Sequence, residues 1–185
     1  MNLKLDWING VTNKKGQHIF LCGLMGAGKS TVGKELSYRL NRAFVDLDEQ
    51  IELTSEQSIQ EIFSEYGEEK FRSIESEALE QIMKRDESFV CALGGGSLVK
   101  EKNTILLQSH SLIYLQASAV FLAQRLNEDQ SRPLLQNCDR EEKLDLLLKE
   151  RKSSYENADL HVNVEGQSIE VIVQSILNWI HNENS

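Results

Sequence analysis

GLMGAGKST, at residues 23–31, is the stretch of sequence that decides the fold. It follows an apolar run, HIFLC at 18–22, and precedes a helical pattern, KSTVGKELSYRL at 29–40. A strand, a glycine-rich loop and a helix in this order form a phosphate-binding loop. The glycines let consecutive backbone amides point at one phosphate, and the helix N-terminus adds partial positive charge. The sequence therefore predicts a nucleoside triphosphate site.

Two side chains of this loop have specific expected roles. Lys29 is placed to reach the terminal phosphates, and the hydroxyl of Ser30 is placed to ligate Mg²⁺. The pattern predicts that the nucleotide contacts most of the loop, namely Gly26, Ala27, Gly28, Lys29, Ser30 and Thr31.

The composition is that of an ordinary globular domain. The 185 residues are 40% hydrophobic and 26% charged, which suits one domain with its own hydrophobic core. The formal net charge of −9 argues against a nucleic-acid partner, because binding a phosphate backbone takes clustered Lys and Arg. It does not argue against a small anion, since local geometry in one cleft outweighs the net charge.

The N-terminal segment and the cysteines add little information about function. Residues 1–17 contain no apolar stretch of signal-peptide length, and we interpret them as a polar leader of unassigned role. Nothing later approaches a membrane span of about twenty apolar residues. The number and spacing of Cys22, Cys91 and Cys138 indicate neither a disulfide framework nor a zinc site. We expect a cytoplasmic protein with reduced thiols and no membrane contact.

Short apolar runs alternate with helical patterns along the remaining chain. Strands that alternate with helices predict an α/β fold, with a parallel sheet covered on both faces and ligands at the carboxyl ends of the strands. The five expected strands are His18–Cys22, Ala43–Leu47, Ser88–Leu93, Ser111–Leu115 and Leu160–Val164.

Amphipathic stripes with a period near 3.6 predict the core faces of the helices. Ser58-Ile-Gln-Glu61 fits a capping box at the start of one of them. The stripes are Val32, Leu36 and Leu40; Ile59, Ile62, Phe63 and Tyr66; Phe71, Ile74, Ala78, Leu79 and Ile82; Leu144, Leu147, Leu148, Arg151 and Tyr155; and Ile169, Ile172, Val173, Ile176 and Ile180.

Two acids mark the end of the second expected strand, FVDLD at 44–48. Strand alternation would put Asp46 and Asp48 on the same side, near the phosphate edge. One carboxylate could hold Mg²⁺ through its water shell while the other accepts a proton from an attacking hydroxyl. Two solvated acids at a strand end are the alternative, which the nearby phosphate-binding loop makes less attractive.

Three glycines, Gly94, Gly95 and Gly96, follow the third expected strand. Consecutive glycines cost backbone entropy and supply no packing. A turn needs one of them, so three favour a ligand that lies against the backbone.

Four arginines are candidate anion contacts. Arg151 lies on an apolar stripe, where an inward guanidinium needs an anionic partner, and spacing alone favours an internal salt bridge over a ligand. Arg132 lies in the polar segment 127–139, either a mobile lid or a plain surface loop, from which it could neutralise charge during transfer. Arg125 is either solvated or stacked on adenine. Arg72 belongs to the motif Gly-Glu-x-x-Phe-Arg-x-x-Glu at 67–75.

Taken together, these motifs resemble shikimate kinase from about His18 to His181. The phosphate-binding loop alone is shared by many functions, whereas the combination is specific. Its elements are GLMGAGKSTVGKEL at 23–36, FVDLD at 44–48, SIQEIFSEYGEEKFRSIE at 58–75, LGGG at 93–96, RPLL at 132–135 and RKSSYENAD at 151–159.

The resemblance implies a nucleoside-monophosphate-kinase-like fold, a three-layer α/β sandwich around a five-stranded parallel sheet of order 2-3-1-4-5. It implies ATP-dependent phosphorylation of the 3-hydroxyl of shikimate, in the pathway to chorismate and aromatic amino acids. Residues 18–185 would be a single, monomeric P-loop kinase domain. Its shikimate-binding segment would span about 48–76, and its lid about 127–139.

The resemblance also implies roles for residues on the acceptor side. Asp48 would contact the accepting hydroxyl as the candidate base. Arg72 and Arg151 would clamp the substrate carboxylate, which reverses the preference for an internal salt bridge at Arg151. The backbone of Gly94–Gly96 would contact the ring, and Glu75 would orient Arg72.

On the donor side, the resemblance implies that Ser30 ligates Mg²⁺ directly and that Asp46 acts through water. Lys29 and the lid residue Arg132 would act on the transferred phosphoryl group, and Arg125 and Gln167 would lie at the nucleotide. The segment 127–139 matches the family only at RPLL, and the loop around Gln167 matches loosely.

Two other functions remain possible. A related small-metabolite kinase, such as gluconate kinase, also acts on a carboxylated acceptor, so only the whole motif set favours shikimate. A non-catalytic nucleotide-binding module is the second alternative. The intact set Lys29, Ser30, Asp46 and Asp48 weighs against it.

Overall fold

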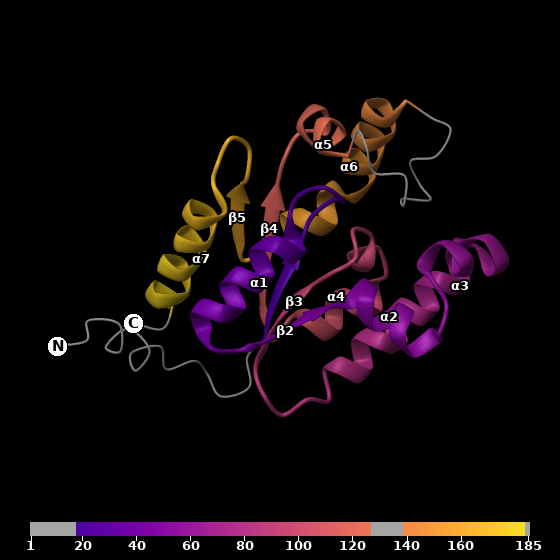
Figure 1. Ribbon diagram of the computed structural model, residues 1–185, viewed down its shortest axis with the longest axis horizontal. Helices are drawn as coiled ribbons and strands as arrows, with labels where there is room; N and C mark the ends of the chain where they lie inside the picture. The colour runs from indigo at the N-terminus through magenta and orange to yellow at the C-terminus, as the bar shows by residue number, and fades with distance from the viewer. Residues whose placement is uncertain (1–17, 127–138, 184–185) are drawn as a thin grey trace.

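The structure is a computed structural model that describes residues 18–126 and 139–183. Within these residues, five parallel strands form one sheet in the order β2-β3-β1-β4-β5, which confirms the expected topology (Figure 1). The strands are β1 (Ile19–Cys22), β2 (Ala43–Asp46), β3 (Phe89–Ala92), β4 (Ser111–Gln116) and β5 (Leu160–Asn163).

The central strands owe their apolar sequence to burial on both faces. All four residues of β1 and of β3 are buried, as expected of a parallel sheet covered by helices on both sides. In β1, Ile19 pairs in register with Val90 of β3 and with Ser111 of β4. This register brings the carboxyl ends of the three central strands to one edge of the sheet.

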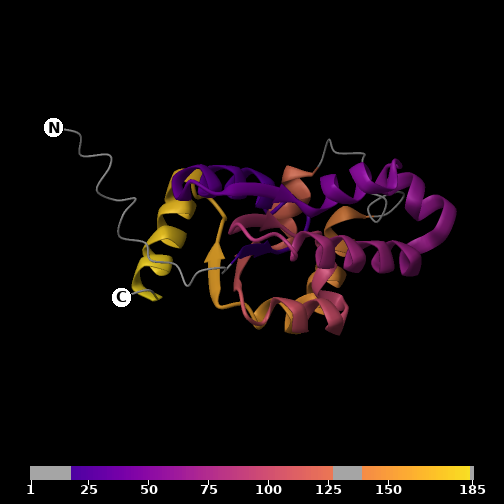
Figure 2. The same cartoon turned by 90° about the horizontal axis from the view of Figure 1, so that it is seen from below.

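Helices cover both faces of the sheet, so the molecule has three layers (Figures 1 and 2). Ile19 and Leu21 of β1 belong to one core cluster, whereas Phe20 and Cys22 belong to the other. Helices α1, α5 and α7 pack into the first cluster, α2, α3 and α4 into the second, and α6 contributes to both. The helices are α1 (Lys29–Leu40), α2 (Leu47–Ser55), α3 (Ile59–Ile82), α4 (Glu101–Leu107), α5 (Ala119–Arg125), α6 (Arg140–Glu156) and α7 (Ile169–Glu183).

Helix α3 contains two of the stripes that the sequence predicts. It begins with the expected capping box: the hydroxyl of Ser58 accepts the amide of Glu61, and the Glu61 carboxylate accepts the amide of Ser58 at 2.7 Å. The helix is interrupted at Gly67, whose φ of 77° and ψ of 177° are non-helical. Tyr66, expected in the core, is 48% exposed because it lies just before this break, where the helix extends away from the sheet (Figure 1).

The end of β2 differs from the sequence-based expectation. The strand stops at Asp46 instead of Leu47, because the carboxylate of Asp46 accepts the backbone amide of Asp48 at 3.1 Å and caps α2. Leu47 is already the first residue of α2 and is fully buried. Asp46 and Asp48 therefore lie on a helix start, and strand alternation does not explain their proximity.

Two cysteines are buried thiols, as expected. Cys22 and Cys91 are free, and burial raises the pKa of Cys22 to about 12 and that of Cys91 well above its ordinary value. Cys138 lies outside the described residues. In the part of the chain that the structure covers, no helix has the length and apolar character to cross a membrane.

Candidate functional site

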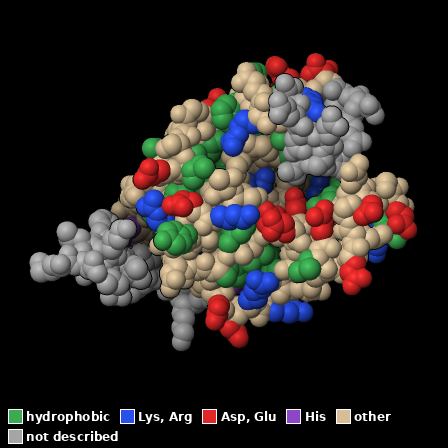
Figure 3. Space-filling view, in the orientation of Figure 1, with side chains coloured by type: hydrophobic (Ala, Val, Ile, Leu, Met, Phe, Trp, Pro, Cys, Tyr) green, Lys and Arg blue, Asp and Glu red, His purple; other side chains and the backbone are tan. Residues whose placement is uncertain are grey.

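One cavity of about 610 Å³ lies where the carboxyl ends of β1, β2 and β3 meet the helices α2 and α3. In the space-filling view, acidic and basic side chains gather around the hollow in the visible face (Figure 3). Most of the site residues that the sequence predicts line this cavity: Gly26, Gly28, Lys29, Ser30, Thr31, Asp46, Asp48, Arg72, Gly94, Gly95, Gly96, Arg125 and Arg151.

The glycine-rich loop connects β1 to α1 at this cavity. Gly26 and Gly28 have φ of 83° and 91°, a left-handed conformation that is costly for other residues. The ammonium of Lys29 donates hydrogen bonds to the carbonyls of Gly23 at 2.9 Å and Leu24 at 3.2 Å. Its charge therefore lies over the loop that would hold the phosphates.

Ser30 and Asp46 bring two oxygen ligands together beside the loop. The hydroxyl of Ser30 donates to Oδ2 of Asp46 at 2.5 Å. Among the described residues, no cluster of three or more His, Cys, Asp or Glu side chains could hold a metal ion by itself. One or two protein oxygens fit Mg²⁺, which keeps several waters and takes further ligands from phosphates.

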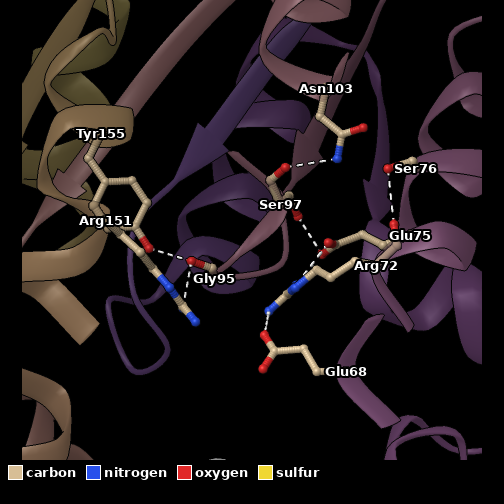
Figure 4. Close-up of polar contacts among 9 residues, drawn as sticks. All are labelled: Glu68, Arg72, Glu75, Ser76, Gly95, Ser97, Asn103, Arg151 and Tyr155. Atoms are coloured by element: carbon tan, nitrogen blue, oxygen red, sulfur yellow. Dashed lines mark hydrogen bonds and ion pairs between the residues drawn. The ribbon is translucent and has the colours of Figure 1, made fainter. Parts of the chain in front are cut away.

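Arg72 lies at the centre of a buried hydrogen-bond network (Figure 4). Its Nη1 donates to Oε2 of Glu75 at 2.8 Å, and its Nη2 lies 3.1 Å from Oε1 of Glu68. The hydroxyl of Ser97 donates to the second oxygen of Glu75 at 2.6 Å, and Asn103 donates to the carbonyl of Ser97 at 2.8 Å. Burial alone would lower the pKa of Arg72, but its interactions with Glu75 and Glu68 outweigh burial and raise it.

Neighbouring side chains leave no room for a Cβ atom at two positions of the triple glycine. A Cβ atom on Gly96 would lie 2.3 Å from Nη2 of Arg72, and one on Gly94 would lie 2.5 Å from Oε1 of Glu75 and 2.9 Å from Oδ1 of Asp48. These contacts explain two of the three glycines without a ligand. They also place the loop directly against Arg72 and Asp48, to which the resemblance assigns contacts with the acceptor.

Arg151 reaches the same loop from helix α6. It is 5% exposed, and its Nη1 donates to the carbonyl of Gly95 at 2.9 Å. Among the described residues it makes no ion pair, so the internal salt bridge that spacing favours is absent there. The partner is instead a backbone carbonyl, which satisfies one donor and leaves the charge of Arg151 facing the cavity beside Arg72 (Figure 4).

Arg125 and Gln167 line a smaller cavity of about 200 Å³ next to the loop, together with Gly28 and Thr31. Ala27 lines it as well, and Arg125 lines both cavities. The segment 127–138 and Arg132 within it lie outside the described residues. Asp139, the last residue of the expected lid, is the N-cap of α6.

Sequence reasoning missed three residues of the site. Tyr155 donates its hydroxyl to the carbonyl of Gly95, one helical turn after Arg151. Its spacing of four residues from Arg151 on one stripe was a usable signal. Ser97 directly follows the triple glycine, whereas nothing in the sequence pattern marks Asn103.

Known proteins resemble this chain over most of its length. The model of the family described as "Shikimate kinase" matches residues 25–181. A shikimate kinase from Prochlorococcus marinus is 42% identical over 85% of this chain and 83% of that protein. One from Geobacter sulfurreducens is 39% identical over 89% of this chain and 91% of that protein.

Among solved structures, the chain is similar to the shikimate kinase from Acinetobacter baumannii in complex with shikimate. The TM-score is 0.86 at 36% identity, covering 90% of this chain and 94% of the other. The family model covers far more than half of the sequence, and the two relatives are 42% and 39% identical over most of both chains. The chain belongs to the shikimate kinase family.

Proposed function

We propose that this chain transfers the γ-phosphoryl group of ATP to the 3-hydroxyl of shikimate, giving shikimate 3-phosphate and ADP. The supporting observation is that one cavity is lined by both the phosphate-binding loop and two buried arginines, Arg72 and Arg151. A triphosphate donor needs the first feature. A small carboxylated acceptor needs the second, and Arg151 in particular has the neutral carbonyl of Gly95 as its hydrogen-bond partner and no ion pair among the described residues.

The donor binds along the loop. The backbone amides of residues 26–31 and the ammonium of Lys29 hold the phosphates, so that Lys29 exchanges its loop carbonyls for phosphate oxygens. Arg125 and Gln167 lie at the adenine side, since both line the smaller cavity next to the loop.

Mg²⁺ fits the oxygen pair of Ser30 and Asp46, with Ser30 as the direct ligand and Asp46 acting through water. When bound, the ion neutralises charge on the transferred phosphoryl group. The 2.5 Å contact between the two side chains supports this assignment, because it brings a hydroxyl and a carboxylate oxygen together at the cavity beside the phosphate-binding loop.

The acceptor binds between α3 and α6. Arg72 and Arg151, which both line the cavity, hold its carboxylate, and the backbone of Gly94–Gly96 lies against its ring. Asp48 accepts the proton of the attacking hydroxyl, since its carboxylate lies at Gly94 beside the phosphate-binding loop. Arg132 would add a cation from the segment 127–139, and the enzyme would act as a monomer on a small-molecule substrate.

The experiment is a coupled assay of ADP release with purified protein, Mg²⁺ and ATP. We expect turnover that depends on shikimate, and a reaction product with the phosphate on the 3-hydroxyl by ³¹P and ¹H NMR. Gluconate and a nucleoside monophosphate serve as competing acceptors in the same assay.

Each alternative function has its own outcome. Turnover on gluconate without turnover on shikimate would assign the chain to a different small-metabolite kinase of the same fold. ATP binding without turnover on any acceptor would indicate a non-catalytic nucleotide-binding module.

A further inference from the structure

The guanidinium of Arg72 interacts with two carboxylates of its own helix. Glu75 lies three residues later and contacts Nη1 at 2.8 Å, and Glu68 lies four residues earlier and contacts Nη2 at 3.1 Å. The two partners differ greatly in exposure, because the Glu75 side chain is 0% exposed and the Glu68 side chain is 53% exposed. The two carboxylates therefore differ in how easily each can leave Arg72.

Glu75 is held firmly in place. Its second oxygen accepts the hydroxyl of Ser97, and its carboxylate lies against Gly94. Removing a buried partner of this kind would leave a charge without compensation, which is strongly unfavourable. Glu75 is thus a permanent partner of Arg72.

The carboxylate of Glu68 has fewer contacts than that of Glu75. Within the described residues, its carboxylate makes no ion pair or hydrogen bond other than that with Arg72. It directly follows Gly67, the non-helical residue of α3, where a Cβ atom would meet nothing within 4 Å. Unlike Arg72, it does not line the cavity. Its half-exposed carboxylate is already partly solvated, so it leaves the guanidinium of Arg72 for solvent at less cost than the buried carboxylate of Glu75 would.

The charges around Arg72 favour this exchange. A substrate carboxylate at Arg72 would be the third negative group on one positive group, and like charges at contact distance repel. Arg151 has no such difficulty, since its described partner is the neutral carbonyl of Gly95. Of the two carboxylates at Arg72, only that of Glu68 is exposed enough for solvent to hydrate it after it leaves Arg72.

We propose that Glu68 competes with the acceptor carboxylate for Nη2 of Arg72 and thereby lowers the affinity of the site for its carboxylated substrate. This inference rests on the proposed function. It assigns a role to Glu68, the acidic residue of the motif at 67–75 that contacts Arg72 from the exposed side.

The test compares Glu68→Gln with Glu69→Gln. Glutamine keeps the shape of Glu68 and an oxygen that accepts from Arg72, so only the charge is lost. Glu69 is the matched control, because it is the adjacent exposed acid on the same helix and lacks the contact with Arg72. We expect Glu68→Gln to lower the KM for shikimate about two- to fivefold relative to Glu69→Gln, with the KM for ATP unchanged.

Shikimate binding by calorimetry gives a second readout that does not depend on turnover. Glu68→Ala is the second variant, and it should also tighten binding, because the competition requires the carboxylate. A KM and a Kd for shikimate that stay unchanged or rise in both Glu68 variants would overturn the inference and make Glu68 a support for Arg72. Absence of shikimate turnover in the unmodified enzyme would instead refute the proposed function.

Discussion

The carbonyl oxygen of Gly95 accepts two hydrogen bonds from helix α6, one from the guanidinium of Arg151 and one from the hydroxyl of Tyr155. The Tyr155 ring is 2% exposed and stacks on Tyr114 of β4, with ring centroids 4.9 Å apart. Burial raises the pKa of Tyr155, so its hydroxyl stays protonated and remains a donor. Tyr155 therefore fixes the glycine loop against the helix that carries Arg151.

Tyr155→Phe should weaken acceptor binding while sparing the donor. The variant keeps the stacked ring and removes one hydrogen bond to Gly95, so the loop and Arg151 lose a shared anchor. We expect the KM for shikimate to rise about two- to tenfold, as one neutral hydrogen bond predicts, with the KM for ATP unchanged. Steady-state kinetics with each substrate varied in turn measure both constants.

Tyr114→Phe is the control, because Tyr114 has the same stacked ring and its hydroxyl has no hydrogen-bond partner among the described residues. It should leave both KM values unchanged. If Tyr155→Phe lowered only the melting temperature and left the KM for shikimate intact, Tyr155 would serve packing alone.

At the scale of elements, helix α3 depends on its capping box. Ser58→Ala removes the hydroxyl that accepts the amide of Glu61, so one amide of the first turn loses its partner. We expect the free energy of unfolding to fall by about 1 kcal/mol, as measured by urea denaturation.

Ser64→Ala is the matched control on the same helix. Its hydroxyl donates to the carbonyl of Glu61 within the helix and is exposed, so its loss should change stability little. Equal destabilisation by both substitutions would mean that the capping box adds nothing to α3.

The elements show why sequence reasoning found the fold and misplaced some details. Apolar runs predict the central strands β1, β3 and β4, because a parallel sheet buried on both faces demands them. The edge strands β2 and β5 have only one buried residue each, and they were predicted from shorter apolar patterns. The predicted end of β2 at Leu47 is wrong because the side chain of Asp46 caps helix α2. The strand therefore ends at Asp46, and the helix begins at the next residue. Likewise, the sequence predicts two stripes, 59–66 and 71–82, on either side of Gly67, but it does not show that one helix spans both with a non-helical residue at Gly67.

The site was predictable where a motif carries its own chemistry. Lys29 and Ser30 lie in a loop whose spacing defines phosphate binding, and they line the cavity as expected. Contacts between distant segments were not predictable, because spacing says nothing about which residues meet in space. The carbonyl of Gly95 as a partner of Arg151, 56 residues away, is of this kind.

At the scale of the whole molecule, the charge is distributed unevenly. The chain has a formal net charge of −9, and the cavity is lined by four cations, Lys29, Arg72, Arg125 and Arg151, together with five carboxylates, those of Asp46, Asp48, Glu49, Glu52 and Glu75. The attraction of a small anion therefore depends on where each cation lies within the cavity and not on an excess of positive charge there. The net negative charge of the chain disfavours long polyanions.

Acid stability is a property of the whole molecule that depends on the start of β1. His18 is 3% exposed and stacks on Phe89 at 3.9 Å, and its Nδ1 has no hydrogen-bond partner among the described residues. Burial, followed by the charges of His110 and Arg42, lowers its pKa from 6.5 to about 4. The unfolded chain therefore takes up a proton between pH 6.5 and 4 that the folded protein resists, and stability falls as the pH falls through this window.

His18→Phe should remove this acid sensitivity, because phenylalanine keeps a ring against Phe89 and cannot bind a proton. We expect the unmodified protein to lose about 1–2 kcal/mol more stability than the variant between pH 7 and pH 5, measured by urea unfolding at each pH. His161→Gln is the control, since His161 is exposed on β5, and it should behave as the unmodified protein does. Parallel loss of stability in His18→Phe and the unmodified protein would mean that carboxylates or His110, which packs against His18, dominate the response to acid.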